Sequence, residues 1–180
     1  MSARTLVAGI GNVFLTDDAF GVEVANRLAE RTLPEGVRVE DFGIRGIHLA
    51  YELLDGYDAL VLVDAVPMGE APGTVALIEP QVASPAGAES DVEVTLVDAH
   101  TMSPDVVLAT LARLGGSVDR VVIVGCQPAD LREGMGLTPA VEDAVDAAAD
   151  LCLDVVNEIV NAHAVTAGAP SAETERGTQP

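Results

Sequence analysis

The stretch "LVAGIGNVFLTDDAFGVEVANRL", residues 6–28, is the part of the sequence that determines the fold. An apolar run ends in Gly-Ile-Gly-Asn and leads into an amphipathic run, which is the pattern of a strand, a tight turn and a helix. In a nucleotide-binding protein, a phosphate would bind at this turn. Here two adjacent carboxylates, Asp17 and Asp18, follow the turn, and their charge opposes a phosphate at a helix N-terminus. The turn is therefore better suited to a cation.

The same alternation continues along the chain. Runs rich in Val and Leu predict strands, and apolar positions at helical spacing predict the helices between them. The predicted strands are residues 4–10, 37–42, 59–65, 74–79, 92–97 and 120–125, and the predicted helices are residues 19–31, 46–54, 103–114 and 138–162. Near-continuous apolar strands that alternate with helices imply a sheet buried on both faces. We therefore predict an α/β fold, a three-layer α/β/α sandwich around a mostly parallel sheet.

Two helices carry start signals, because Ser103 and Thr138 each precede a proline and can act as N-caps. A chain of 180 residues suits a single core. We predict one domain over residues 1–163, with a surface loop at 80–91. Residues 164–180 carry no periodic apolar face, and we expect a disordered acidic tail there.

The composition argues against three classes of protein: nucleic-acid-binding, membrane-spanning and disulfide-rich proteins. The formal net charge of −20 opposes binding to nucleic acid. No apolar run reaches the roughly 18 residues of a spanning helix, and no signal peptide is evident. Cys126 and Cys152 are too few for a disulfide framework and are read as buried apolar residues. We expect a cytoplasmic monomer without a membrane partner.

Polar residues follow most of the predicted strands. In open α/β sheets, functional groups gather beyond the carboxyl ends of the strands. The polar residues found there are Asn12, Asp17, Asp18, Asp41, Asp64, Asp98, His100 and Gln127. Acids therefore dominate this edge of the predicted sheet, and hardly a base joins them except Arg45.

Several of these residues have structural alternatives. One helix start has one N-cap, so we assign Asp17 as a cap or turn residue and Asp18 as the site group. Asp64 follows five apolar residues, and bonds to backbone amides would explain it as well as a functional role. His100 taken alone is an ordinary loop histidine. Together, however, Asp18, Asp64 and His100 form a candidate divalent-metal site, because three protein ligands leave a position open.

Four segments, in this order, resemble the hydrogenase maturation endopeptidases: "GIGNVFLTDDAFGVEVANRL", "LVDAV" followed by "APGTVALIEP", "DAHTMSP" and "GLTPAVEDAV". The resemblance covers roughly residues 4–160. It implies a five-stranded α/β/α sandwich. It also implies an endopeptidase that removes the C-terminal extension of a [NiFe]-hydrogenase large-subunit precursor after nickel insertion.

The resemblance also implies roles for individual residues. Matched position by position, the family's metal-binding residues fall on Asp18, Asp64 and His100. The turn Gly43, Ile44, Arg45 and Gly46 resembles the segment that recognises the substrate. On this interpretation the nickel arrives with the precursor, and the protein needs no nucleotide.

The catalytic mechanism is less defined by the sequence. No Ser–His–Asp or Cys–His arrangement can be assembled, and H-E-x-x-H is absent. The family is usually classed with the aspartic endopeptidases. We therefore take Asp18 and Asp64 as the catalytic candidates, either as a dyad that shares a proton or as groups acting beside nickel. The alternatives are a non-catalytic nickel-checking chaperone and a nucleotide-binding domain based on Gly-Ile-Gly-Asn.

Overall fold

The computed structural model describes residues 3–80 and 104–167. The strands are β1 (Thr5–Ile10), β2 (Val37–Gly43), β3 (Ala59–Ala65), β4 (Val75–Ile78) and β5 (Arg120–Cys126). A 3₁₀ turn, η1 (Thr16–Ala19), precedes the helices α1 (Phe20–Ala29), α2 (Gly46–Leu53), α3 (Pro104–Arg113), α4 (Pro139–Glu142) and α5 (Val145–Ala167).

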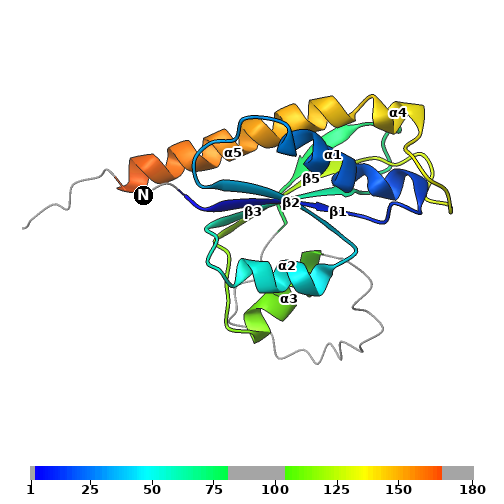
Figure 1. Ribbon diagram of the computed structural model, residues 1–180. Coiled ribbons are helices and arrows are strands. Elements are labelled where there is room, and N and C mark those ends of the chain that lie inside the picture. The colour runs from blue at the N-terminus through cyan, green and yellow to red at the C-terminus, as the bar shows by residue number, and fades with distance from the viewer. Residues whose placement is uncertain (1–2, 81–103, 168–180) are drawn as a thin grey trace, which may run out of the picture.

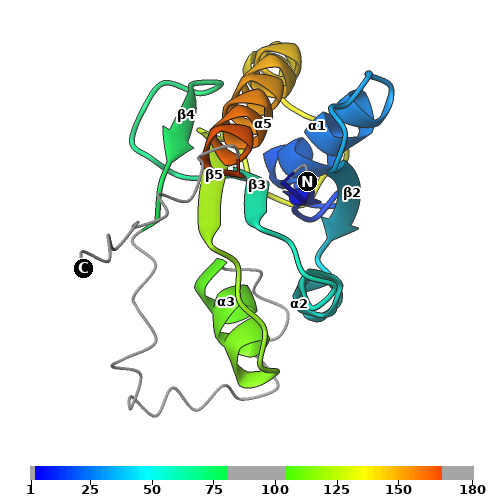
Figure 2. The same ribbon diagram turned by 90° about the vertical axis from the view of Figure 1, so that its left-hand side faces the viewer.

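The strands form one sheet in the order β2-β1-β3-β5-β4. The pairs β1–β2, β1–β3 and β3–β5 are parallel, and β4 joins β5 antiparallel at one edge, as Figure 2 shows. After β1 the chain adds β2 on one side and then returns to add β3 on the other side. The strand order therefore reverses between β1 and β3. In open α/β sheets this reversal opens a crevice at the carboxyl ends of the two strands.

Helices cover both faces of the sheet. Figure 1 shows α1, α4 and α5 on one face and α2 with α3 on the other. Successive residues of a strand point to opposite faces. Accordingly, Val7 and Val61 pack into the core beneath α1 and α5, and Leu6 and Leu60 pack into the core beneath α2 and α3. The predicted three-layer sandwich with a mostly parallel five-stranded sheet is confirmed.

The predicted elements agree closely with the structure, with two differences. The helix predicted at 138–162 is two helices, because α4 ends at Glu142 and α5 begins at Val145. The helix α5 also reaches Ala167, beyond the domain boundary expected at residue 163. The strand predicted at 92–97, nearly all of the loop predicted at 80–91 and the tail from residue 168 lie outside the described residues.

Two smaller predictions can also be compared with the structure. Thr138 stands at the N-cap of α4 and is followed by Pro139, as predicted, whereas Ser103 lies outside the described residues. In the part of the chain that the structure describes, no helix is both long enough and apolar enough to cross a bilayer.

Candidate functional site

A cleft of about 470 Å³ lies where the strand order reverses, and its volume is in the usual range of ligand pockets. The segment after β1 contributes Asn12 and Asp18 to its lining, the end of β3 contributes Asp64, and the turn after β2 contributes Gly43 and Ile44. Segments that are far apart in sequence thus meet at the edge predicted from the strand ends.

Glycines bring these segments together. A Cβ atom on Gly21, in the first turn of α1, would lie 2.0 Å from the carbonyl oxygen of Val63 and 2.3 Å from that of Ile10. A Cβ atom on Gly11 would lie 1.7 Å from the carbonyl oxygen of Asp18. Only glycine therefore lets the start of α1 sit directly on the ends of β1 and β3. This close packing places the acidic turn beside the residue that follows Val63, which is Asp64.

Asp18 lies in η1 and is held on the inner side of the turn. Its carboxylate accepts a hydrogen bond from the backbone N–H of Asn12 at 2.7 Å, and its own N–H donates to the carbonyl of Leu15 at 3.1 Å. The amide of Asn12 is one that a phosphate would need in a nucleotide-binding turn. Because a carboxylate already occupies it, the geometry argues against the nucleotide alternative.

Asp64 lies at the end of β3 in an environment that opposes its charge. Burial, and then the negative charge of Asp18, raise the pKa of Asp64 to about 7, although the backbone amide of Ala65 acts in the other direction. If Asp64 had only a structural role, backbone donors would have to offset its burial, and here they do not. A shared proton or a bound cation would relieve the repulsion between Asp18 and Asp64.

Asp17 differs from its prediction as a helix cap. The N-cap positions of η1 and α1 are occupied by Leu15 and Ala19, and Asp17 lies inside the 3₁₀ turn with no exposed surface. The cap interpretation is therefore wrong, and only the placement in a turn is right. The reason is that Asp17 points away from its own helix, toward a segment more than a hundred residues later.

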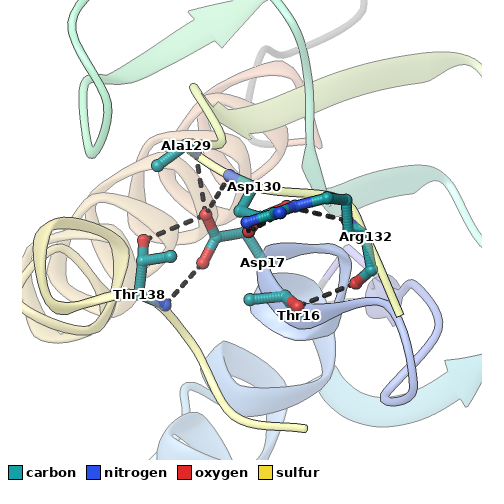
Figure 3. A network of polar contacts seen from close by, with 6 residues as sticks. All are labelled: Thr16, Asp17, Ala129, Asp130, Arg132 and Thr138. Atoms are coloured by element: carbon teal, nitrogen blue, oxygen red, sulfur yellow. Dashed lines mark hydrogen bonds and ion pairs between the residues drawn. The ribbon is translucent and has the colours of Figure 1, made fainter. Parts of the chain in front are cut away.

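That segment, residues 129–138, is here called the strap. One carboxylate oxygen of Asp17 accepts the N–H groups of Ala129 at 2.8 Å and Asp130 at 2.9 Å and the hydroxyl of Thr138 at 3.0 Å (Figure 3). The other oxygen accepts the N–H of Thr138 at 2.7 Å. Burial alone would raise the pKa of Asp17, but these donors together lower it below its usual value. Asp17 is therefore a buried anion that holds the strap.

The backbone of the strap continues this contact. The N–H of Thr16 donates to the carbonyl of Gly134 at 3.0 Å, and the N–H of Gly134 donates to the carbonyl of Phe14 at 2.9 Å. The hydroxyl of Thr16 donates to the carbonyl of Arg132 at 2.8 Å. Our sequence analysis did not identify the strap as part of the site. The local signal is that two aspartates, Asp17 and Asp18, stand side by side before one helix, which has only one N-cap position.

The turn proposed for substrate recognition lies beside the same site. Gly43 has φ +53°, a conformation that favours glycine, and its carbonyl accepts the N–H of Gly11 at 3.0 Å. Gly43 and Ile44 line the cleft, and Ile44 is exposed. The guanidinium of Arg45 donates to the carbonyls of Phe42 and Asp41 in its own loop. The fourth residue of the turn, Gly46, begins α2.

The two cysteines are buried and free, as predicted. Burial, with a smaller contribution from the charge of Asp17, raises the pKa of Cys126 to about 11. Burial alone raises the pKa of Cys152 to about 12. Because the thiolate is the reactive form, neither residue is suited to act as a nucleophile near neutral pH.

The third predicted metal ligand, His100, and the nearby Asp98 lie outside the described residues. Within residues 3–80 and 104–167, no three His, Cys, Asp or Glu side chains are grouped closely enough to hold a metal ion. The described part of the site therefore supplies two of the three predicted ligands, Asp18 and Asp64. Asp41 and Gln127, also at strand ends, are not among the described residues that line the cleft.

Comparison with known proteins gives consistent matches. The family HycI, described as hydrogenase maturation protease, matches residues 22–155. The hydrogenase expression/formation protein HupD of Rhodobacter capsulatus is 37% identical over 146 residues, which are 79% of this chain and 66% of that protein. The hydrogenase 2 maturation protease of Escherichia coli (strain K12) is 32% identical over 162 residues, 86% of this chain and 92% of that protein.

A solved structure shows the same fold. The hydrogenase maturating endopeptidase HybD from E. coli superimposes with a TM-score of 0.68 at 28% sequence identity. The match covers 86% of this chain and 93% of that chain. The similarity therefore extends over most of both chains.

Proposed function

Because this chain belongs to the hydrogenase maturation protease family, we propose that it is the endopeptidase that removes the C-terminal extension of a [NiFe]-hydrogenase large-subunit precursor once nickel has been inserted. The single observation that carries this proposal is the pair of carboxylates, Asp18 and Asp64, in the cleft between β1 and β3. Family membership supports hydrolysis of a hydrogenase precursor, and the pair supplies the groups for it.

We further propose that Asp18 and Asp64, with His100, bind the nickel that the precursor carries. Two carboxylates that repel each other in a partly buried cleft favour a cation between them. Carboxylate oxygens and an imidazole nitrogen are suitable ligands for a divalent transition ion. In this proposal the metal belongs to the substrate, and it brings the scissile peptide into the cleft.

Peptide hydrolysis then requires an activated water molecule. Without bound nickel, Asp64 has a pKa of about 7, which suits a general base at neutral pH. Nickel bound to its carboxylate would lower that pKa and would leave activation of the water to the metal. Without nickel on its carboxylate, Asp64 would take a proton from the water that attacks the scissile carbonyl, with Asp18 as the second member of the pair. If nickel is not needed for the reaction, the same two residues would work as an aspartic dyad that shares one proton.

The test uses the purified protein and two forms of the large-subunit precursor, with and without nickel. Mass spectrometry should show loss of the C-terminal extension only from the nickel-loaded form. The variants Asp18→Asn, Asp64→Asn and His100→Ala should each abolish the cleavage while the far-UV circular dichroism spectrum stays unchanged. Equal cleavage of the nickel-free precursor would eliminate nickel recognition and leave the dyad mechanism.

A second candidate function is a nickel-checking chaperone that binds the subunit without cutting it. The observation in its favour is that both described cysteines, Cys126 and Cys152, are buried and poorly suited to be nucleophiles. A chaperone would form a stable complex with the nickel-loaded precursor and leave its mass unchanged. The same mass measurement therefore separates the two functions.

A further inference from the structure

Asp17 is the feature of the site that the proposed chemistry does not use. Its side chain is completely buried, and both carboxylate oxygens accept hydrogen bonds from the strap, residues 129–138. A helix cap usually satisfies one or two backbone amides of its own helix. Asp17 instead accepts three amides and one hydroxyl from a distant segment, so its function concerns how that segment lies (Figure 3).

The strap also fixes the residue before Asp17. Thr16 has φ +49°, which is strained for a residue with a branched side chain. Two hydrogen bonds hold it there: its N–H donates to Gly134 at 3.0 Å and its hydroxyl to Arg132 at 2.8 Å. Such strain persists only where the surroundings over-determine the backbone. Here the strap provides those surroundings.

Asp18 is the next residue along this turn. Its carboxylate accepts the N–H of Asn12 at 2.7 Å, so it is fixed on the side of β1. On the other side, the direction of its Cα–Cβ bond depends on the backbone of Thr16 and Asp17. If the strap were released, the strained turn would relax and the carboxylate of Asp18 would move relative to Asp64.

We propose that Asp17 is a positioning residue, whose buried carboxylate anchors the strap on the turn and so orients the carboxylate of Asp18 toward Asp64. This inference depends on the proposed function, because it gives Asp17 a role through Asp18. Loss of an outer hydrogen bond that orients a site group commonly lowers activity by about 10- to 100-fold.

The test compares Asp17→Asn with Ile159→Ala, a change at a buried position of α5 far from the cleft. The neighbouring residue Glu158 forms an ion pair with Arg120, the first residue of β5, so Ile159 lies near the end of the sheet opposite the cleft. Processing of the nickel-loaded precursor is measured for both variants, together with the melting temperature of each. We expect Asp17→Asn to lower kcat about 10- to 100-fold with KM changed less than about threefold, and Ile159→Ala to lower the melting temperature with kcat unchanged. Equal kcat values for the two variants would overturn the inference.

A second pair of variants applies if Asp17→Asn does not fold. Thr138→Val removes the hydroxyl that donates to Asp17, and Thr138→Ser keeps it. We expect kcat to fall several-fold in the valine variant and to be restored in the serine variant. Equal kcat values in both would overturn the inference.

Failure of the positioning role of Asp17 can be distinguished from failure of the proposed function. If Asp18→Asn processes the precursor normally, the proposed site is wrong. If Asp18→Asn is inactive while Asp17→Asn and Thr138→Val both keep full kcat, only the positioning role fails.

Discussion

At the scale of single residues, Asp64 lowers the stability of the protein at neutral pH. Its pKa is about 7 in the folded protein, and it returns to the ordinary value of 3.8 when the chain unfolds. Between about pH 4 and pH 7 the folded state therefore binds more protons at this site than the unfolded state does. The free energy of unfolding must then fall as the pH rises through this window, by on the order of 4 kcal/mol.

The prediction is that Asp64→Asn stabilises the protein at pH 8 and has little effect at pH 4. Urea unfolding of both proteins at the two pH values, with a chelator present, measures the difference. Asp119→Asn, which removes one aspartate carboxylate at an exposed position, is the matched control. The raised pKa of Asp64 would be contradicted if Asp64→Asn changed the free energy of unfolding by the same amount at both pH values.

At the scale of secondary structure, most elements were predictable because their signals are local. The apolar runs at 59–65 and 120–125 read directly as buried strands, and β3 and β5 begin at the predicted residues. Thr138 followed by Pro139 correctly marked the start of α4. Strand ends then indicated Asp18 and Asp64, since parallel strands present their carboxyl ends at one edge.

The strap was not predictable in the same way. Asp17 and Thr138 are 121 residues apart, and no periodicity connects them. The sequence around residues 129–138 resembles an ordinary loop, and a buried aspartate followed by a second one resembles a helix cap. Only the folded chain shows that the polar groups of the loop and the carboxylate satisfy each other.

The turn after β2 provides a prediction at this scale. Ile44 and Ile47 are equally exposed, at 48% and 47%, but only Ile44 is among the described residues that line the cleft. If the turn contacts the precursor, Ile44→Ser should raise KM about three- to thirty-fold through lost apolar contact, with kcat nearly unchanged. Ile47→Ser should leave both constants unchanged. Identical KM values for the two variants would remove this turn from substrate recognition.

At the scale of the whole molecule, the charge of −20 is the dominant feature. All nine bases are arginines, and 29 acids oppose them. Several arginines form surface ion pairs, among them Arg31 with Asp150 and Arg120 with Glu158. Exposed pairs of this kind contribute about 0–1 kcal/mol each. Acids outnumber arginines by 20 (29 against nine), and their mutual repulsion acts on the entire surface and grows with the net charge, so we expect it to outweigh these few attractions.

Salt should therefore stabilise the protein, although it weakens its ion pairs. Raising NaCl from about 20 mM to 300 mM shortens the Debye length from about 20 Å to about 6 Å, which screens repulsion between separated acids more than attraction between adjacent groups. We expect the melting temperature at pH 8 to rise by about 2–4 °C, corresponding to about 1 kcal/mol. Calorimetry in NaCl and in KCl should give the same rise, since screening does not depend on the cation. A fall in the melting temperature would show that the arginine pairs contribute more than the net repulsion removes.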